Sequence, residues 1–280
     1  MDKKFTHLHV HSHYSLLDGL SKIPNLLDYT KELGMDAIAI TDHGVLYGNV
    51  EFYKEAKKKG VKPIFGMEAY VANHTHLDRR PGIDDTRYHL TLLCKNNLGY
   101  KNLVKLSSKS HLTGFYYKPR VDKELLRQYG EGLIALSGCL NGEIAKSILS
   151  GNKTKAEEII QEYADIFGKD NFYLELQHHP NILEQIKVNK ALLELAQKLK
   201  LPLVATQDSH YLKPEDAEAQ DILLAIQTGD KTTDEKRSLT MKDEDFSLTS
   251  PEQMRQFFKD TPEAVENTQK IAEICNVELE

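Results

Sequence analysis

The chain has 280 residues, of which 40% are hydrophobic and 28% are charged, and its formal net charge at pH 7 is −6. This composition is that of a soluble globular protein of one large or two small domains, without a membrane span or signal segment. The acidic balance argues against non-specific wrapping of nucleic acid, although metal cations can reverse the local charge of a site. Cys94, Cys139 and Cys275 are widely spaced and odd in number, which argues for a reducing cytoplasm rather than a disulfide framework.

Short apolar runs rich in β-branched residues alternate with longer amphipathic stretches along the chain. The apolar runs predict strands at residues 6–11, 37–41, 62–68, 88–93, 133–137, 172–177 and 203–206. The amphipathic stretches predict helices at 23–33, 50–59, 100–110, 153–167 and 182–199. This alternation predicts an α/β fold with a mostly parallel sheet, which is either a distorted TIM-like (β/α)7 barrel or a doubly wound open sheet.

Two segments fall outside this alternation. Residues 73–86 are polar and contain a Pro-Gly turn, so we expect a mobile surface loop in which His74 and His76 are solvated. The strand pattern is lost from about residue 213, and Pro251 and Pro262 stand near predicted helix starts. We therefore expect a barrel over about residues 1–212 and a helical segment over about 213–280.

Four histidines, His7, His9, His11 and His13, occupy alternate positions at the start of the chain. Alternate residues of an extended strand point to the same face, and neutral imidazole is a common ligand of transition-metal ions. A histidine-rich start that is merely solvated is the alternative, but the intervening residues are apolar, as in a buried strand. The row therefore suggests a metal site that needs further ligands from elsewhere in the chain.

Residues able to bind metal recur where the predicted strands end. They are Asp42 and His43 after 37–41, Glu68 at the end of 62–68, Cys139 after 133–137, and Asp208 and His210 after 203–206. His89 lies within 88–93, and Asp18 lies in a Leu-Asp-Gly turn. Each could alone be a turn residue, a helix cap, a salt-bridge partner or a small core cysteine. The carboxyl ends of barrel strands meet at one face, however, so their coincidence predicts a metal site there.

Several motifs together carry a resemblance to a known family: HLHVHSHYSLLDG, AIAITDHG, KPIFGMEAYV, GFYYKPRVD, ALSGCLNGE and VATQDSHYL. They resemble the PHP (polymerase and histidinol phosphatase) domain, and most closely the PHP domains of bacterial replicative DNA polymerase III alpha subunits. The segments DILLAIQTG and FSLTSPEQM extend the resemblance over essentially the whole chain. The chain is thus expected to be a single PHP domain that ends where the polymerase module of that family begins.

The resemblance implies a distorted barrel of seven βα units that holds two or three divalent metal ions. The family's ligand positions correspond to His9, His11, Asp18, His43, Glu68, His89, Cys139, Asp208 and His210. This mixed set of imidazole, carboxylate and thiolate ligands suits Zn, Mn or Fe better than Mg or Ca. In one departure, PHP phosphatases commonly have aspartate where this chain has His7, and His13 is expected to be solvated.

The ligand set and the resemblance together imply a metal-dependent phosphodiesterase, namely a 3′–5′ proofreading exonuclease acting on a single-stranded 3′ end of DNA during replication. Clustered divalent ions can activate a water molecule and stabilise displacement at phosphorus. Asp208 and His7 are the candidates for handling the proton of the leaving oxygen.

Basic and aromatic side chains are expected to bind the rest of the substrate. Arg87 shares a strand face with His89 and could direct a phosphate toward the metals. The segment GFYYKPR supplies Tyr117, Lys118 and Arg120, a combination that often holds single strands by stacking and by cation contacts. The alternative is that this segment packs against a neighbouring domain.

Two other functions remain open at this point. The domain could be a scaffold that stabilises the rest of the polymerase alpha subunit and docks a separate proofreading subunit, alone or in addition to catalysis. It could also be a small-molecule phosphatase of the histidinol-phosphatase type, although the polymerase-like motifs count against that.

Overall fold

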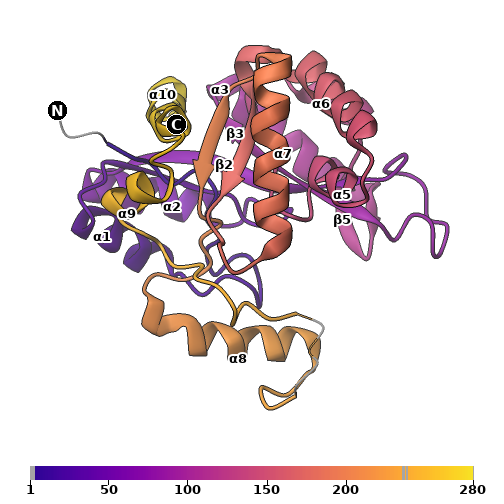
Figure 1. The fold of residues 1–280 in the computed structure, drawn as a ribbon. Coiled ribbons are helices and arrows are strands. Elements are labelled where there is room, and N and C mark those ends of the chain that lie inside the picture. Colours follow the sequence, from indigo (N-terminus) through magenta and orange to yellow (C-terminus); the bar gives the residue numbers. More distant parts are fainter. Residues whose placement is uncertain (1–3, 235–236, 238, 280) are drawn as a thin grey trace.

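The computed structural model describes residues 4–234, 237 and 239–279. Its centre is a curled eight-stranded sheet (Figure 1). The strands are β1 (Ala37–Ile40), β2 (Lys62–Ala72), β3 (Arg87–Cys94), β4 (Phe115–Tyr116), β5 (Lys118–Val121), β6 (Leu133–Leu136), β7 (Phe172–Gln177) and β8 (Leu203–Thr206). They follow the order β4-β5-β2-β3-β6-β7-β8, and β1 pairs with the first part of β2.

Most neighbouring strands run parallel, as the sequence predicts. The exceptions are β3, which is antiparallel to both β2 and β6, and the short β4, which is antiparallel to β5. The start of β3 therefore lies beside the carboxyl ends of its neighbours. The predicted α/β barrel-type class is confirmed, with one central strand reversed.

Residues 6–11 form an extended segment rather than the regular strand predicted there. On one side the carbonyls of His7 and Val10 accept hydrogen bonds from β1 and the residue after it, at 2.9 and 2.8 Å. On the other side the His11 N–H donates to Ser209 O at 2.8 Å, and the Ser209 N–H donates to His9 O at 3.2 Å. Since Ser209 follows β8, the segment bridges the two ends of the curl and takes one strand position of the barrel.

Helices cover the outer side of the curl. They are α1 (Ile23–Glu32), α2 (Asn49–Lys59), α3 (Asn97–Leu112), α4 (Lys123–Tyr129), α5 (Glu143–Leu149), α6 (Lys153–Phe167) and α7 (Leu183–Leu199), and their buried faces share one apolar core with the strands. Three of them begin at a polar residue whose side chain accepts a hydrogen bond from the first turn, namely Asn96, Asp122 and Asn152. Such caps explain where these helices start.

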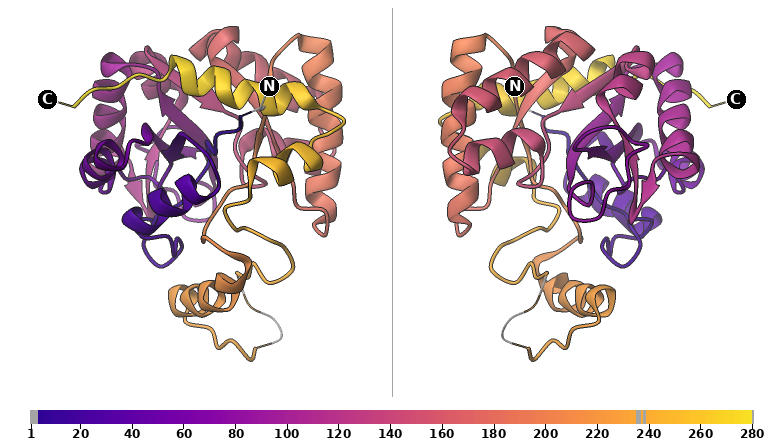
Figure 2. Two further views of the ribbon diagram at one scale, coloured as in Figure 1. Left: turned by 90° about the vertical axis from the view of Figure 1, so that its left-hand side faces the viewer. Right: turned by 90° about the vertical axis from the view of Figure 1, so that its right-hand side faces the viewer.

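The C-terminal part of the chain lies at both ends of the barrel. Helix α8 (Ala217–Thr228) stands apart below the main body, whereas α9 (Pro251–Phe257) and α10 (Pro262–Ile274) return to it (Figure 2). Ile271 of α10 and the nearby Cys275 join the inner core beside Ile64 and Val204, so α10 packs against the end of the barrel opposite α8. The C-terminal segment expected from about residue 213 thus contains α8, which stands apart, and α9 and α10, which pack on the main body.

The two prolines mark helix starts as predicted, because Pro251 and Pro262 are the first residues of α9 and α10. Within the described residues, no helix combines the length and apolar character needed to span a membrane.

Candidate metal centre

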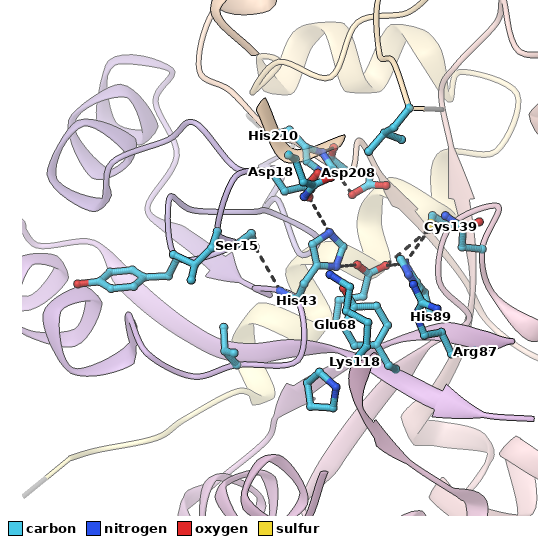
Figure 3. Close-up of a pocket in the computed structure, with 18 of the residues that line it drawn as sticks. Ser15, Asp18, His43, Glu68, Arg87, His89, Lys118, Cys139, Asp208 and His210 are labelled. Atoms are coloured by element: carbon cyan, nitrogen blue, oxygen red, sulfur yellow. Dashed lines mark hydrogen bonds and ion pairs between the residues drawn. The ribbon is translucent and has the colours of Figure 1, made fainter. Parts of the chain in front are cut away.

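The nine predicted ligands meet at one end of the barrel. Figure 3 labels Asp18, His43, Glu68, His89, Cys139, Asp208 and His210 among them. His43 follows β1, Glu68 lies in β2, Cys139 follows β6, and Asp208 and His210 follow β8. His89 belongs to the reversed strand β3, so it reaches this rim from the beginning of its strand rather than from the end. The extended segment adds His9 and His11, and the turn after it adds Asp18.

Glu68 is at the middle of the cluster. Its Oε2 lies 2.6 Å from His43 Nδ1 and 3.6 Å from His11 Nε2. Its Oε1 lies 2.9 Å from His89 Nδ1, 3.3 Å from His9 Nε2 and 3.6 Å from Cys139 Sγ. One carboxylate therefore faces four imidazoles and the thiol.

Two aspartates flank this centre. Asp208 Oδ1 lies 3.2 Å from His11 Nε2 and 3.3 Å from His9 Nε2. Asp18 Oδ2 lies 2.7 Å from His43 Nε2 and 3.2 Å from His210 Nε2. Asp208 has a left-handed backbone conformation, with φ of 54°, which is uncommon outside glycine and is found at functional sites.

Hydrogen bonds outside the cluster orient the imidazoles. His9 Nδ1 donates to Glu175 Oε1 at 2.7 Å, and His210 Nδ1 donates to the carbonyl of Asp208 at 2.7 Å. These bonds place a proton on Nδ1 and direct each Nε2 into the cluster, where its lone pair would be available to a bound metal ion, as in metal-binding histidines supported by a carboxylate or carbonyl. Glu175 was not predicted, although a single charge inside the apolar strand FYLELQ is a visible signal.

The three carboxylates are held in the ionised form. Burial would raise the pKa of Glu68, but His89, His43 and His9 outweigh this and hold that pKa well below its usual range. At Asp18 and Asp208 burial would likewise raise the pKa, but the nearby histidines outweigh this effect and lower the pKa of both carboxylates. Burial and then the charges of Glu68 and Asp208 raise the pKa of Cys139, so its thiolate needs a cation nearby.

The inward-facing atoms of the cluster fit bound cations. Among the described residues, five of its buried atoms contact one another at 2.6–3.3 Å but form no well-aligned hydrogen bond: His9 Nε2, His11 Nε2, His43 Nδ1, Glu68 Oε2 and Asp208 Oδ1. Buried polar atoms are rarely left without a partner, and lone pairs are what a metal ion needs. Three sets of side chains have ligand atoms within 4.8 Å of one another: His11, Asp18, His43 and His210; His9, His11 and Asp208; and His43, Glu68 and His89. The residues thus fit the expected cluster of divalent ions.

A cavity of about 370 Å³ opens over the cluster. Arg87 and Lys118 line it, as expected for groups that bind a substrate, and both are half-buried. Tyr70, which was not predicted, also lines it. The wall on the α8 side includes Gln227 and Met241.

Two other predicted substrate contacts lie elsewhere. Arg120 is fully buried and donates to the backbone carbonyls of Gly114, Asp84, His76 and Asp78, at 3.1, 2.9, 3.3 and 2.7 Å. It therefore fastens the loop 73–86 rather than binding substrate. Tyr117 is 66% exposed and is not among the residues that line the cavity.

The same contacts correct the expectation of a mobile, solvated loop. Besides Arg120, Asp122 also holds the loop. Its Oδ2 accepts a hydrogen bond from the backbone N–H of His76 at 2.8 Å and lies 2.5 Å from Nδ1 of the His76 ring. His74 is half exposed, as expected, and contacts Asp84 at 3.2 Å.

The other histidines of the N-terminal row lie outside the cluster. His7 Nε2 donates to the carbonyl of Thr249 at 2.8 Å, and its buried ring packs edge-on against Phe5. Burial lowers the pKa of His7 to about 4. This position does not support the expected role of His7 in proton transfer. His13 is half-buried against Tyr14 rather than fully solvated.

Comparison with known proteins agrees with this geometry. Residues 7–179 match the PHP domain family. The chain is 50% identical over 274 residues to the DNA polymerase III subunit alpha of Borreliella burgdorferi. This match covers 98% of this chain and 24% of that protein. For the same subunit of Treponema pallidum the identity is 48% over 276 residues, covering 98% of this chain and 23% of the relative. The chain thus spans about a quarter of the length of these relatives.

One solved structure shows the same fold at low sequence identity. It is an amidohydrolase from Chromobacterium violaceum with bound sulfate and no metal, with a TM-score of 0.51 and 14% identity over 73% of this chain and 87% of that one. The family match, which covers more than half of the chain, carries the assignment: the chain belongs to the PHP domain family.

Proposed function

We propose that this domain is a metal-dependent phosphodiesterase that removes nucleotides from the 3′ end of single-stranded DNA, as a proofreading 3′–5′ exonuclease. Its partners are then a DNA strand and the remaining parts of a replicative polymerase, by analogy with the DNA polymerase III alpha subunits that the chain resembles. A separate proofreading subunit is the partner expected if the domain also serves as a scaffold.

The observation that carries this proposal is the complete set of nine ligand-type side chains in one cluster. Bound divalent ions would supply an activated water and would stabilise the negative charge that develops at phosphorus. A domain that served only as a scaffold has no need to keep three ionised carboxylates packed against five imidazoles, since unbalanced buried charge is costly.

The chain's own residues supply orientation and charge. Glu175 and the carbonyl of Asp208 orient His9 and His210, and Arg87 and Lys118 bring positive charge to the wall of the cavity. Asp208 is the remaining candidate for accepting or returning a proton, because its Oδ1 faces the cluster, 3.2 Å from His11 Nε2 and 3.3 Å from His9 Nε2.

The test combines metal content with nuclease activity. Wild-type chain reconstituted with Mn²⁺ or Zn²⁺ should bind metal by elemental analysis and shorten a 3′-labelled single strand, as well as a primer with a mismatched 3′ end. His43→Ala and Asp208→Asn should lose both properties, and His76→Ala should keep them because His76 lies outside the cluster. Wild type that holds metal but leaves every 3′ end intact would refute the nuclease proposal.

The same assay separates the alternatives. A phosphatase of small molecules would release phosphate from a chromogenic monoester faster than nucleotides from an oligonucleotide. A scaffold would bind a polymerase or proofreading subunit equally well in wild type and in His43→Ala.

A further inference from the structure

Tyr70 contacts two cations at the wall of the cavity. Arg87 Cζ lies 5.8 Å and Lys118 Nζ 5.7 Å from the centroid of its ring, within the range of cation–π contact. The ring also touches the cluster: its centroid is 5.8 Å from that of His43 and 5.2 Å from that of His89. Tyr70 is therefore the side chain that joins the two cations to the candidate metal centre.

Strand register explains this meeting of side chains. Tyr70 lies on β2, two residues after Glu68 and thus on the same face of the strand. It pairs with His89 of β3 on one side and with Arg120 of β5 on the other. Arg87 comes two residues before His89 on β3, and Lys118 comes two residues before Arg120 on β5. The three adjacent strands therefore direct Tyr70, Arg87 and Lys118 to one face.

The ring is held in place by its neighbours. A Cβ atom at Gly44 would come within 2.8 Å of Pro119 and 3.2 Å of the Tyr70 ring, which shows how closely these residues pack. Tyr70 itself is only 6% exposed. A fixed aromatic face of this kind restricts where two long, flexible cationic side chains can go.

Neither cation is neutralised by the described part of the chain. Arg87 donates to the backbone carbonyl of Asp85 at 3.0 Å, and neither Arg87 nor Lys118 forms an ion pair with a described carboxylate. Two half-buried cations on one ring therefore present positive charge to the cavity. An anionic ligand is the partner that suits them.

We propose that Tyr70 positions Arg87 and Lys118 to bind the phosphate next to the one that is cleaved. This inference rests on the proposed function, in which the cluster holds the cleaved phosphate. The preferred substrate class then contains at least two successive phosphodiesters, so the site favours a DNA strand over a molecule with a single phosphate. Tyr70 is a positioning residue in this arrangement, because it acts through the two cations.

Binding experiments test this independently of cleavage. The chain is loaded with Mn²⁺ and titrated against two fluorescent single strands whose terminal linkage is a phosphorothioate that slows cleavage. In the second strand the neighbouring linkage is a neutral methylphosphonate. Fluorescence anisotropy at several salt concentrations gives the Kd and its salt dependence.

The neutral linkage should raise the Kd of wild type by about tenfold or more, because it removes the charge that both cations contact. Arg87→Ala and Lys118→Ala should bind the unmodified strand about tenfold more weakly and respond less to the neutral linkage. Each should also reduce the slope of log Kobs against log salt by about 0.7 in magnitude. Tyr70→Leu should weaken binding in the same way, whereas Tyr70→Phe, which keeps the ring, should stay within about twofold of wild type.

The matched control is Lys105→Ala, which removes another cation that contacts a tyrosine ring, at 5.5 Å from Tyr129 and outside the cavity. It should behave as wild type. The inference is overturned if the neutral linkage raises the Kd of Arg87→Ala by the same factor as that of wild type. It is also overturned if Tyr70→Leu binds the unmodified strand as tightly as wild type does. Sensitivity to the neutral linkage without any cleavage of a normal strand would instead contradict the proposed function and leave the phosphate site standing.

Discussion

Replacing Glu175 by glutamine should weaken metal binding although Glu175 is not itself a predicted ligand. This buried carboxylate accepts four hydrogen bonds. Oε1 accepts from His9 Nδ1 at 2.7 Å, from Thr206 Oγ1 at 2.6 Å and from Gln177 Nε2 at 3.3 Å, and Oε2 accepts from Gly138 N at 2.9 Å. Every neighbour is a donor, so only a group that accepts at both oxygens satisfies them.

Glutamine keeps the shape but turns one acceptor into a donor. Its NH₂ group must then oppose either the Gly138 N–H or the donors around Oε1, which should lower the free energy of unfolding of the metal-free chain by about 1–3 kcal/mol. The charge that holds His9 with its proton on Nδ1 is also lost. Loss of such a supporting group weakens metal binding by about 10- to 100-fold, or about 1.4–2.8 kcal/mol.

Competition with a chromogenic chelator for Zn²⁺ measures this loss, and chemical denaturation measures the stability. Thr206→Val is the control, because it removes one hydrogen bond to the same carboxylate and leaves the contact between Glu175 and His9. It should change the metal affinity much less than Glu175→Gln does. Equal zinc affinity in Glu175→Gln and wild type would refute the supporting role of Glu175.

Further predictions concern stability. Burial lowers the pKa of His179, which packs against Phe246, to about 4, so the unfolded chain binds a proton more readily below pH 6.5 and stability falls as pH falls toward 4. Between pH 7 and pH 5 the metal-free His179→Leu variant should therefore lose about 2 kcal/mol less unfolding free energy than metal-free wild type. Denaturation curves that show the same loss in both would contradict this. Arg120→Met should destabilise the fold by about 3 kcal/mol and expose the loop to trypsin after Arg79, so resistance to cleavage there would count against its fastening role. Zn²⁺ at about 100 times its Kd should raise the unfolding free energy of wild type by about 2.7 kcal/mol, and an equal rise in His43→Ala would place the metal elsewhere.

Strand ends predicted that metal-binding residues gather at one rim, whereas the choice of His9 and His11 from the N-terminal row came from the family resemblance. His43, Cys139 and Asp208 each follow a short apolar strand, and parallel strands bring such residues to one rim. His89 fits for a reason that periodicity does not show, since its strand is reversed and reaches the rim at its beginning. Glu175 could have been noticed as the single charge in an apolar strand, but its role depends on His9, which is 166 residues away.

Lys118 and Arg120 show why the substrate contacts were harder to predict. Both are cations of the same short strand, two residues apart, and composition treats them alike. Lys118 lines the cavity, whereas Arg120 is surrounded by backbone carbonyls of the loop 73–86. A phosphate oxygen and a backbone carbonyl both accept hydrogen bonds from a guanidinium, and every residue carries a carbonyl, so the local sequence does not show which acceptor an arginine will meet. Only the path of the distant loop decides which cation it covers, and therefore which one remains for a substrate.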